Sequence, residues 1–136
     1  MQPDEARDFI TSNHRAVLAT RRRDGNPQLS PVTCGVDAAG RVIISTRETA
    51  IKTKNLRRDP HAALCVFSDG FFGRWVQVEG SAEVVPLPGA MEPLVDYYRL
   101  VSGEHPDWDD YRAAMARERR VIVRMTIERA GPDISG

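Results

Sequence analysis

A short segment of this 136-residue chain, residues 47–58, concentrates positive charge, with five basic residues and one acidic residue. It contains the only two lysines of the sequence, Lys52 and Lys54, and it follows an apolar run that ends at Ser45 and Thr46. A strand, then hydroxyl groups, then the N-terminus of a basic helix form a favourable anion site, because free backbone N–H groups, the helix dipole and a lysine charge converge there. The segment therefore indicates either a phosphate site or a solvated helix face that pairs with acidic residues elsewhere.

No other set of residues forms a recognisable catalytic motif. The three histidines, His14, His61 and His105, are widely spaced, and we expect each to have a structural or solvent-exposed role. The sequence contains no Gly-x-Gly-x-x-Gly, no Gly-x-x-x-x-Gly-Lys-Ser/Thr, no His-Glu-x-x-His and no Gly-x-Ser-x-Gly. If the protein is an enzyme, we expect a cofactor to provide the reactive group while the protein binds and orients it. The sequence assigns no catalytic side chain.

The two cysteines, Cys34 and Cys65, are far apart in the sequence and belong to no Cys-x-x-Cys pair, which argues against a zinc site. Each lies inside an apolar run, where a free thiol usually packs as a small hydrophobic group. We therefore expect no metal site and two buried thiols.

The composition predicts one globular domain over residues 1–136. Hydrophobic residues make up 41% of the chain, and 19 Lys and Arg balance 19 Asp and Glu. A chain of this length buries about 68% of its unfolded surface, so it can form a core without disulfides or metals. Zero net charge argues against disorder and against a general nucleic-acid-binding protein. The absence of a secretory signal and of an apolar run of ~20 residues predicts a cytoplasmic protein with no membrane partner.

The pattern of apolar residues and turn signals predicts six short strands, several of them joined at hairpin turns such as 24–25 and 69–70. Because few helices separate these strands, we expect a mainly β fold with flanking helices, in which an antiparallel sheet closes into a small barrel. The expected strands are 16–20, 28–36, 42–45, 62–67, 75–85 and 121–128. The expected helices are 3–13, 48–58, 91–101 and 108–115.

Three acidic residues, Asp107, Asp109 and Asp110, fall at the start of the last expected helix. Carboxylates in a first helical turn interact favourably with free N–H groups and with the helix dipole. We therefore interpret this cluster as structural rather than catalytic.

Four segments, in this order, resemble one protein family. Residues 17–30 contain VLAT and DGNPQLS, which resemble a first hairpin, and residues 52–62 read KTKNLRRDPHA. Residues 78–82 read VEGSA, and residues 103–112 read GEHPDWDDYR. Together they resemble the pyridoxamine 5′-phosphate oxidase-like split-barrel proteins, especially their deazaflavin-dependent branch, over nearly the whole chain.

The resemblance implies a six-stranded antiparallel split β-barrel, the FMN-binding split barrel, which forms a homodimer with two cofactor sites at the subunit interface, each drawing on both chains. In the deazaflavin branch the cofactor is coenzyme F420, which carries a phosphate and an oligoglutamate tail; other branches use FMN. The implied activity is an F420H2-dependent reductase that transfers a hydride to a conjugated small-molecule acceptor. The alternatives are an FMN-dependent oxidoreductase of the same fold and an F420 carrier without turnover.

The resemblance also implies roles for residues at matching positions. The residues expected to hold the cofactor phosphate are Ser45, Ala50, Ile51, Lys52 and Asn55. Two further cations, Lys54 and Arg57, could meet the anionic tail. The residues expected along the cofactor ring are Gln28, Ser30 and Val32, with Trp75, Val76 and Gln77 of the partner chain closing the ring pocket. The phosphate residues fall in the same segment that charge and helix polarity single out.

The end of the chain departs from the true pyridoxamine phosphate oxidases. Residues 129–136 read RAGPDISG, which matches only loosely the Arg-Leu-x-Pro-like segment of those enzymes. We therefore do not expect vitamin B6 oxidase activity.

Overall fold

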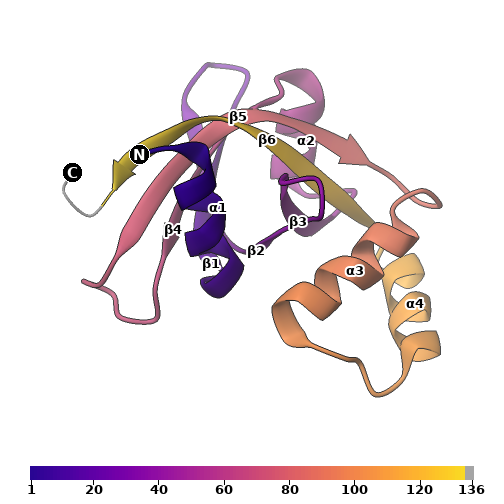
Figure 1. The fold of residues 1–136 in the computed structure, drawn as a ribbon. Helices are drawn as coiled ribbons and strands as arrows, with labels where there is room; N and C mark the ends of the chain where they lie inside the picture. The colour runs from indigo at the N-terminus through magenta and orange to yellow at the C-terminus, as the bar shows by residue number, and fades with distance from the viewer. Residues whose placement is uncertain (134–136) are drawn as a thin grey trace.

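Six antiparallel strands close into a barrel in the order β1-β2-β3-β6-β5-β4 (Figure 1). This computed structural model describes residues 1–133 of the chain, so the last three residues of the C-terminal segment lie outside the described part. The strands are β1 (Arg15–Arg21), β2 (Pro27–Val36), β3 (Val42–Arg47), β4 (His61–Phe67), β5 (Trp75–Val85) and β6 (Arg120–Asp133). The helices are α1 (Pro3–Ser12), α2 (Ile51–Arg58), α3 (Met91–Ser102) and α4 (Trp108–Arg117). The structure confirms the expected antiparallel barrel with flanking helices.

The interior of the barrel is an apolar core built by the alternation of side chains along each strand. Leu18 of β1, Leu64 of β4 and Val78 of β5 are fully buried inside it. Helices α1 and α2 add Ile10 and Leu56 to the same cluster. Removing a buried leucine from such a core costs about 2–5 kcal/mol, so these positions hold the barrel together.

A second apolar cluster lies outside the barrel, beneath α3 and α4. Figure 1 shows these two helices at one end of the molecule, where β5 ends and β6 begins. Leu94 and Tyr97 of α3 and Tyr111 of α4 pack there against Ile43 of β3 and Ile122 of β6. Asp107 caps α4, accepting a hydrogen bond from the Asp110 backbone N–H at 3.1 Å, and Asp109 and Asp110 lie in the first turn of the helix, as expected.

Gly80 stands where β5 and β6 approach too closely for any side chain. A Cβ atom at this position would lie 1.8 Å from the Thr126 carbonyl oxygen, and the pairing register shifts at this point. The glycine of the VEGSA segment is therefore a requirement of the fold.

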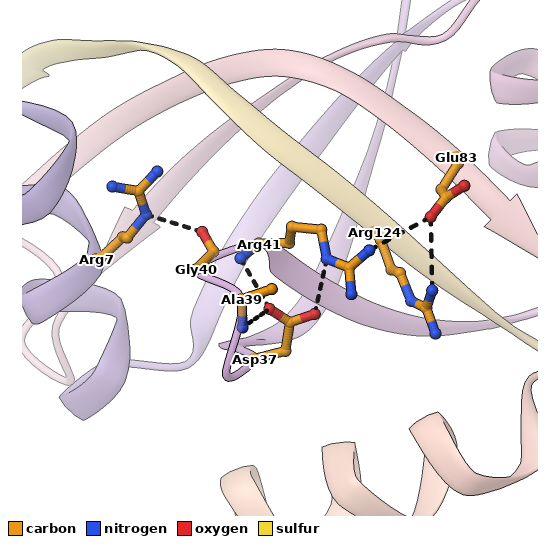
Figure 2. A network of polar contacts seen from close by, with 7 residues as sticks. All are labelled: Arg7, Asp37, Ala39, Gly40, Arg41, Glu83 and Arg124. Carbon is orange, nitrogen blue, oxygen red and sulfur yellow. Dashed lines mark hydrogen bonds and ion pairs between the residues drawn. The ribbon is translucent and has the colours of Figure 1, made fainter.

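A charged network ties the β2–β3 turn to α1, β5 and β6 (Figure 2); its members are Arg7, Asp37, Ala39, Gly40, Arg41, Glu83 and Arg124. The Asp37 carboxylate accepts hydrogen bonds from the backbone N–H groups of Ala39 and Arg41 at 3.0 and 2.9 Å, and from Arg41 Nε at 3.0 Å. Arg7 donates to the Gly40 carbonyl at 2.8 Å. Each charged side chain of this turn network has an oppositely charged partner.

The two cysteines differ from each other. Cys34 is buried as expected, and burial raises the pKa of its thiol to about 12. The expectation was wrong for Cys65, which is exposed. Its neighbours Leu64 and Val66 point into the core, so alternation along β4 turns the Cys65 side chain outward. Because β4 carries apolar residues on both faces, alternation alone does not indicate which face is buried.

Within residues 1–133, no cluster of three or more His, Cys, Asp or Glu side chains has the arrangement of a metal site. The helices of the same part of the chain are all too short or too polar to cross a membrane.

Candidate functional site

A cavity of about 610 Å³ opens between the barrel wall and the helices, and we call it the β3–α2 cleft. Its walls come from β2, β3, the N-terminal end of α2, and the pair α3 and α4. This volume falls in the range of small-molecule and cofactor sites. The cleft is therefore where the expected anion site and a neighbouring ligand ring could both be accommodated.

The floor of the cleft is the connection from β3 into α2. Thr53 Oγ1 donates a hydrogen bond to the Arg47 carbonyl at 2.7 Å, which holds the first helical turn against the end of the strand. No side chain caps the helix at Ala50. The first N–H groups of a helix have no partner within it, so they are available to an anion that also meets the positive end of the helix dipole.

Lys52 is the central cation of the cleft. It is half-buried, and it forms no ion pair with any residue in the described part of the chain. Burial, with a smaller contribution from the neighbouring Arg120 guanidinium, lowers the pKa of the Lys52 ammonium. Arg120 and Arg47 share one carboxylate, that of Glu118, at 2.8 and 3.3 Å. The cleft thus carries excess positive charge that an anionic ligand would neutralise.

Three tyrosines that sequence reasoning did not assign to the site line the other wall. The Tyr97 hydroxyl donates to the Thr33 carbonyl at 2.9 Å, and the Tyr111 hydroxyl donates to the Leu94 carbonyl at 2.8 Å. Burial raises the pKa of each of these two phenols to about 12. The third is Tyr98. The apolar spacing that includes Tyr98 and Tyr111 predicts an amphipathic helix pair, but only the fold brings that pair beside β3.

A second cavity, of about 600 Å³, lies on the other side of the first turns of α2. Arg22 and Arg23 from the β1–β2 hairpin face Lys54 and Arg58 of α2 across it. Arg22 is paired with Asp24 at 3.1 Å. Arg23 and Lys54 have no ion-pair partner among residues 1–133. We call this cation-lined cavity the hairpin cavity.

The expected phosphate and tail residues divide between these two cavities. Ser45, Ala50 and Lys52 line the β3–α2 cleft. Ile51, Lys54 and Asn55 line the hairpin cavity instead. Asn55 also donates from its amide to Thr20 Oγ1 at 3.1 Å, and so anchors α2 to β1.

Arg57 lines neither cavity. Its guanidinium forms a two-point ion pair with the Glu48 carboxylate, with one contact at 3.0 Å, and this pair lowers the pKa of Glu48. Arg57 is therefore already engaged by the protein.

The expected ring residues lie on the N-terminal part of β2, which is not paired with β3. The two strands pair only from Cys34 to Val36, so the stretch with Gln28, Ser30 and Val32 has no β3 neighbour. Val32 lines the cleft. Ser30 Oγ is the one side-chain polar atom of residues 1–133 that is buried without a hydrogen-bond partner. A polar ligand atom beside β2 would satisfy it, so Val32 and Ser30 fit a cofactor ring. Gln28 lines neither cavity and is bonded within the chain, to Thr20 Oγ1 and to the Leu29 carbonyl.

The three residues expected to meet the partner's cofactor ring differ in direction. Val76 is buried in the barrel core, so its side chain is not available to a second chain. Trp75 and Gln77 alternate with it and lie on the outer face, opposite Phe67 and Cys65 of β4. Only these two side chains of the set can contact another chain.

The comparisons with known proteins agree with this architecture. The family model of pyridoxamine 5′-phosphate oxidase matches residues 2–131. A solved structure of a conserved hypothetical protein from Mycobacterium tuberculosis is 30% identical and superposes with a TM-score of 0.77, over 96% of this chain and 82% of that one.

Two more distant structures share the fold. A protein described as an F420 reductase is 21% identical, with a TM-score of 0.70 over 91% of this chain and 94% of that one. A haem-binding protein from Mycobacterium smegmatis is 22% identical, with a TM-score of 0.68 over 94% of this chain and 52% of that one. With the family match over nearly its whole length, the chain belongs to the pyridoxamine 5′-phosphate oxidase family.

Proposed function

We propose that this protein binds coenzyme F420 in the β3–α2 cleft and uses the reduced cofactor to reduce a conjugated small-molecule acceptor by hydride transfer. The observation that carries the proposal is a set of unpaired cations on and beside α2: Lys52 lies in the cleft, and Lys54 and the hairpin residue Arg23 line the hairpin cavity. One phosphate would neutralise only part of this charge. A cofactor with a phosphate and an oligocarboxylate tail would neutralise more of it, and a solved F420 reductase shares the fold.

Residues of α2, β3 and β2 would hold such a cofactor. The uncapped N-terminus of α2, with Ser45 and Lys52, would bind the phosphate. Val32 and the unpaired hydroxyl of Ser30 would lie along the ring. When bound, reduced F420 supplies the hydride, and the protein's contribution to rate is orientation and exclusion of water.

Two other functions remain as outcomes of the same experiment. An FMN-dependent oxidoreductase would use the cleft in the same way, but FMN carries a single phosphate and would leave the cations of the hairpin cavity without a partner. An F420 carrier would bind the cofactor without turnover. Haem is less well supported, because none of the three histidines lines the cleft and histidine is a common axial haem ligand.

We also propose that a second copy of the chain covers the outer face of β1, β2, β4 and β5. Val17 and Pro31 stand side by side on this face, next to the exposed Cys65, and Leu29 is 62% exposed. Trp75 and Gln77 lie on the same face. In such a dimer, these two side chains of each copy would lie toward the cleft of the other copy. Light scattering behind size exclusion should give the mass of a dimer, and the mass of a monomer at micromolar concentration would contradict this part of the proposal.

The test is a fluorescence titration of the purified protein with F420 and, separately, with FMN. We expect tight binding of F420 and weaker binding of FMN, followed by oxidation of F420H2 when an acceptor such as menadione is added. Arg117→Ala, an exposed charge on α4 that lines neither the cleft nor the hairpin cavity, serves as the matched control. Preferential FMN binding would overturn the cofactor assignment, and F420 binding without turnover of any acceptor would identify a carrier.

A further inference from the structure

The three tyrosines of the cleft use their hydroxyl groups differently. Those of Tyr97 and Tyr111 donate to backbone carbonyls and hold α3 to β2 and α4 to α3. The Tyr98 hydroxyl forms no hydrogen bond with any residue of the described chain. It is not among the buried unpaired polar atoms, where Ser30 Oγ stands alone, so it is open to solvent. Tyr98 therefore lines the cleft with a hydroxyl that is free to donate and to accept a hydrogen bond.

The ring of Tyr98 is nevertheless held firmly. It packs edge-to-face on His105, Trp108 and Tyr111, with ring centroids 4.9, 5.8 and 5.1 Å away. Aromatic contacts of this kind stabilise the ring's position beyond the effect of burial alone. The free hydroxyl is thus placed by a fixed ring.

The aromatic group is itself braced from outside. The Arg99 guanidinium lies 4.7 Å from the Trp108 ring centroid. Glu104 accepts hydrogen bonds from Arg99 Nε at 2.9 Å and from Trp108 Nε1 at 3.2 Å. The wall formed by α3 and α4 is preorganised before any ligand enters.

We propose that Tyr98 is the acceptor-recognition residue of the cleft: its hydroxyl donates a hydrogen bond to a carbonyl oxygen of a flat, conjugated acceptor that stacks near Tyr111 and Met115. This inference rests on the proposed function, and it adds the chemical class of the acceptor, a quinone or other enone. Met115 and the tyrosine rings give an apolar wall that suits such a planar molecule. Lys52 and Ser45, at the α2 side of the same cleft, leave the phosphate position separate from this wall.

The hydrogen bond would strengthen during the reaction. Addition of hydride to a conjugated carbonyl compound places negative charge on the carbonyl oxygen, and a proton from water then completes the two-electron reduction, with the reduced cofactor as the reductant. A donor aimed at an oxygen where charge develops stabilises the transition state more than the ground state. Tyr98 should therefore influence kcat/KM for the acceptor more than acceptor affinity.

The direct test compares wild type with Tyr98→Phe, using menadione and 2-methylnaphthalene, a hydrocarbon of similar shape without carbonyl groups, in calorimetric titrations. We expect the Kd for menadione to rise about 2-fold to 10-fold in Tyr98→Phe, the scale of one hydrogen bond, with no change for 2-methylnaphthalene. Equal effects on both compounds, or no effect on either, would overturn the proposal. So would a wild-type protein that does not bind menadione.

A stability control separates recognition from architecture. Tyr97→Phe removes a hydroxyl bonded to the Thr33 carbonyl and should lower the melting temperature, whereas Tyr98→Phe should leave it unchanged because its hydroxyl has no protein partner. An equal loss of melting temperature in both variants would make Tyr98 structural and contradict the inference.

Kinetics complete the test and distinguish the two levels of proposal. In Tyr98→Phe we expect unchanged F420 affinity and a fall in kcat/KM for menadione of the order of 10-fold to 100-fold. A wild type that fails to bind F420 would overturn the proposed function, while the menadione titrations would still decide the role of Tyr98. Normal F420 binding with unaltered menadione kinetics in the variant would overturn the Tyr98 proposal alone.

Discussion

The turn network and the surroundings of α2 are both rich in charge, but they differ in how that charge is satisfied. In the turn network each charged side chain has a partner of opposite sign, and Asp37 is only 18% exposed. Around α2, Lys52, Lys54 and Arg23 have no ion-pair partner within residues 1–133. A paired charge of low exposure, such as Asp37, stabilises the fold. A half-buried unpaired cation, such as Lys52, has a desolvation cost that only a bound anion would offset. The comparison predicts that substitutions in the first region affect stability, and in the second ligand affinity.

The largest effect should come from Asp37→Ala. This change removes the acceptor of two backbone N–H groups and of Arg41 Nε, and we expect a loss of about 3 kcal/mol in the free energy of unfolding, since hydrogen bonds to charged groups contribute about 1.5–3 kcal/mol each and are not additive. Urea denaturation measures it. Asp37→Asn keeps an oxygen acceptor and should lose much less, and F420 affinity of the folded protein should be unchanged in both variants. A lower affinity would show that the turn network and the site are coupled.

The second prediction is a change that lowers F420 affinity and leaves the stability of the fold unaltered. Lys52→Ala should weaken F420 binding by about 1.5–3 kcal/mol, the scale of a hydrogen bond to a charged group. The same change should leave the free energy of unfolding within about 0.5 kcal/mol, because no ion pair is lost. Fluorescence titration and urea denaturation of the same preparation measure the two quantities. An unchanged Kd would mean that Lys52 is only a surface charge, the alternative left open by its sequence.

The barrel and the basic helix that follows β3 were both predictable because their signals are local. Asp-Gly turns and alternating strands mark the hairpins, and the charge of residues 47–58 marks the start of α2. Arg57 was not predictable, because its pairing with Glu48 depends on how the β3–α2 connection bends. The same holds for Arg23, which reaches α2 only when the β1–β2 hairpin folds. The site role of the α3 tyrosines was not predictable for a similar reason, because an apolar helical pattern is found in any helix that packs on a sheet.

The pH dependence of F420 binding tests whether the unpaired Lys52 differs from the paired charges of the turn network. Burial lowers the pKa of Lys52 in the free protein, and a bound phosphate would raise it again by favouring the charged ammonium. F420 affinity is therefore highest below the pKa that Lys52 has in the free protein, and it falls as the pH rises through that pKa. Where Lys52 is deprotonated in the free protein, binding takes up a proton. We expect F420 affinity to decline at alkaline pH, and the decline should begin below the range in which an ordinary lysine loses its proton. Lys52→Arg keeps its charge throughout this range and should flatten the profile; an equal decline in that variant would assign the titration to another group.

The smallest effect compares two cations on the same helix, Lys54 without a partner and Arg57 paired with Glu48. Lys54→Ala should weaken F420 binding by about 1 kcal/mol, the upper end for an exposed charge pair, and should leave FMN binding unchanged because FMN has no tail to reach the hairpin cavity. Arg57→Ala should change neither affinity, since its guanidinium is already engaged by Glu48. Titrating both variants with both cofactors at low ionic strength measures the difference, and added salt should reduce the Lys54 effect. If Arg57→Ala weakens F420 binding as much as Lys54→Ala does, a cation engaged in an ion pair can still serve the ligand, and pairing within the protein no longer separates structural charge from binding charge along α2.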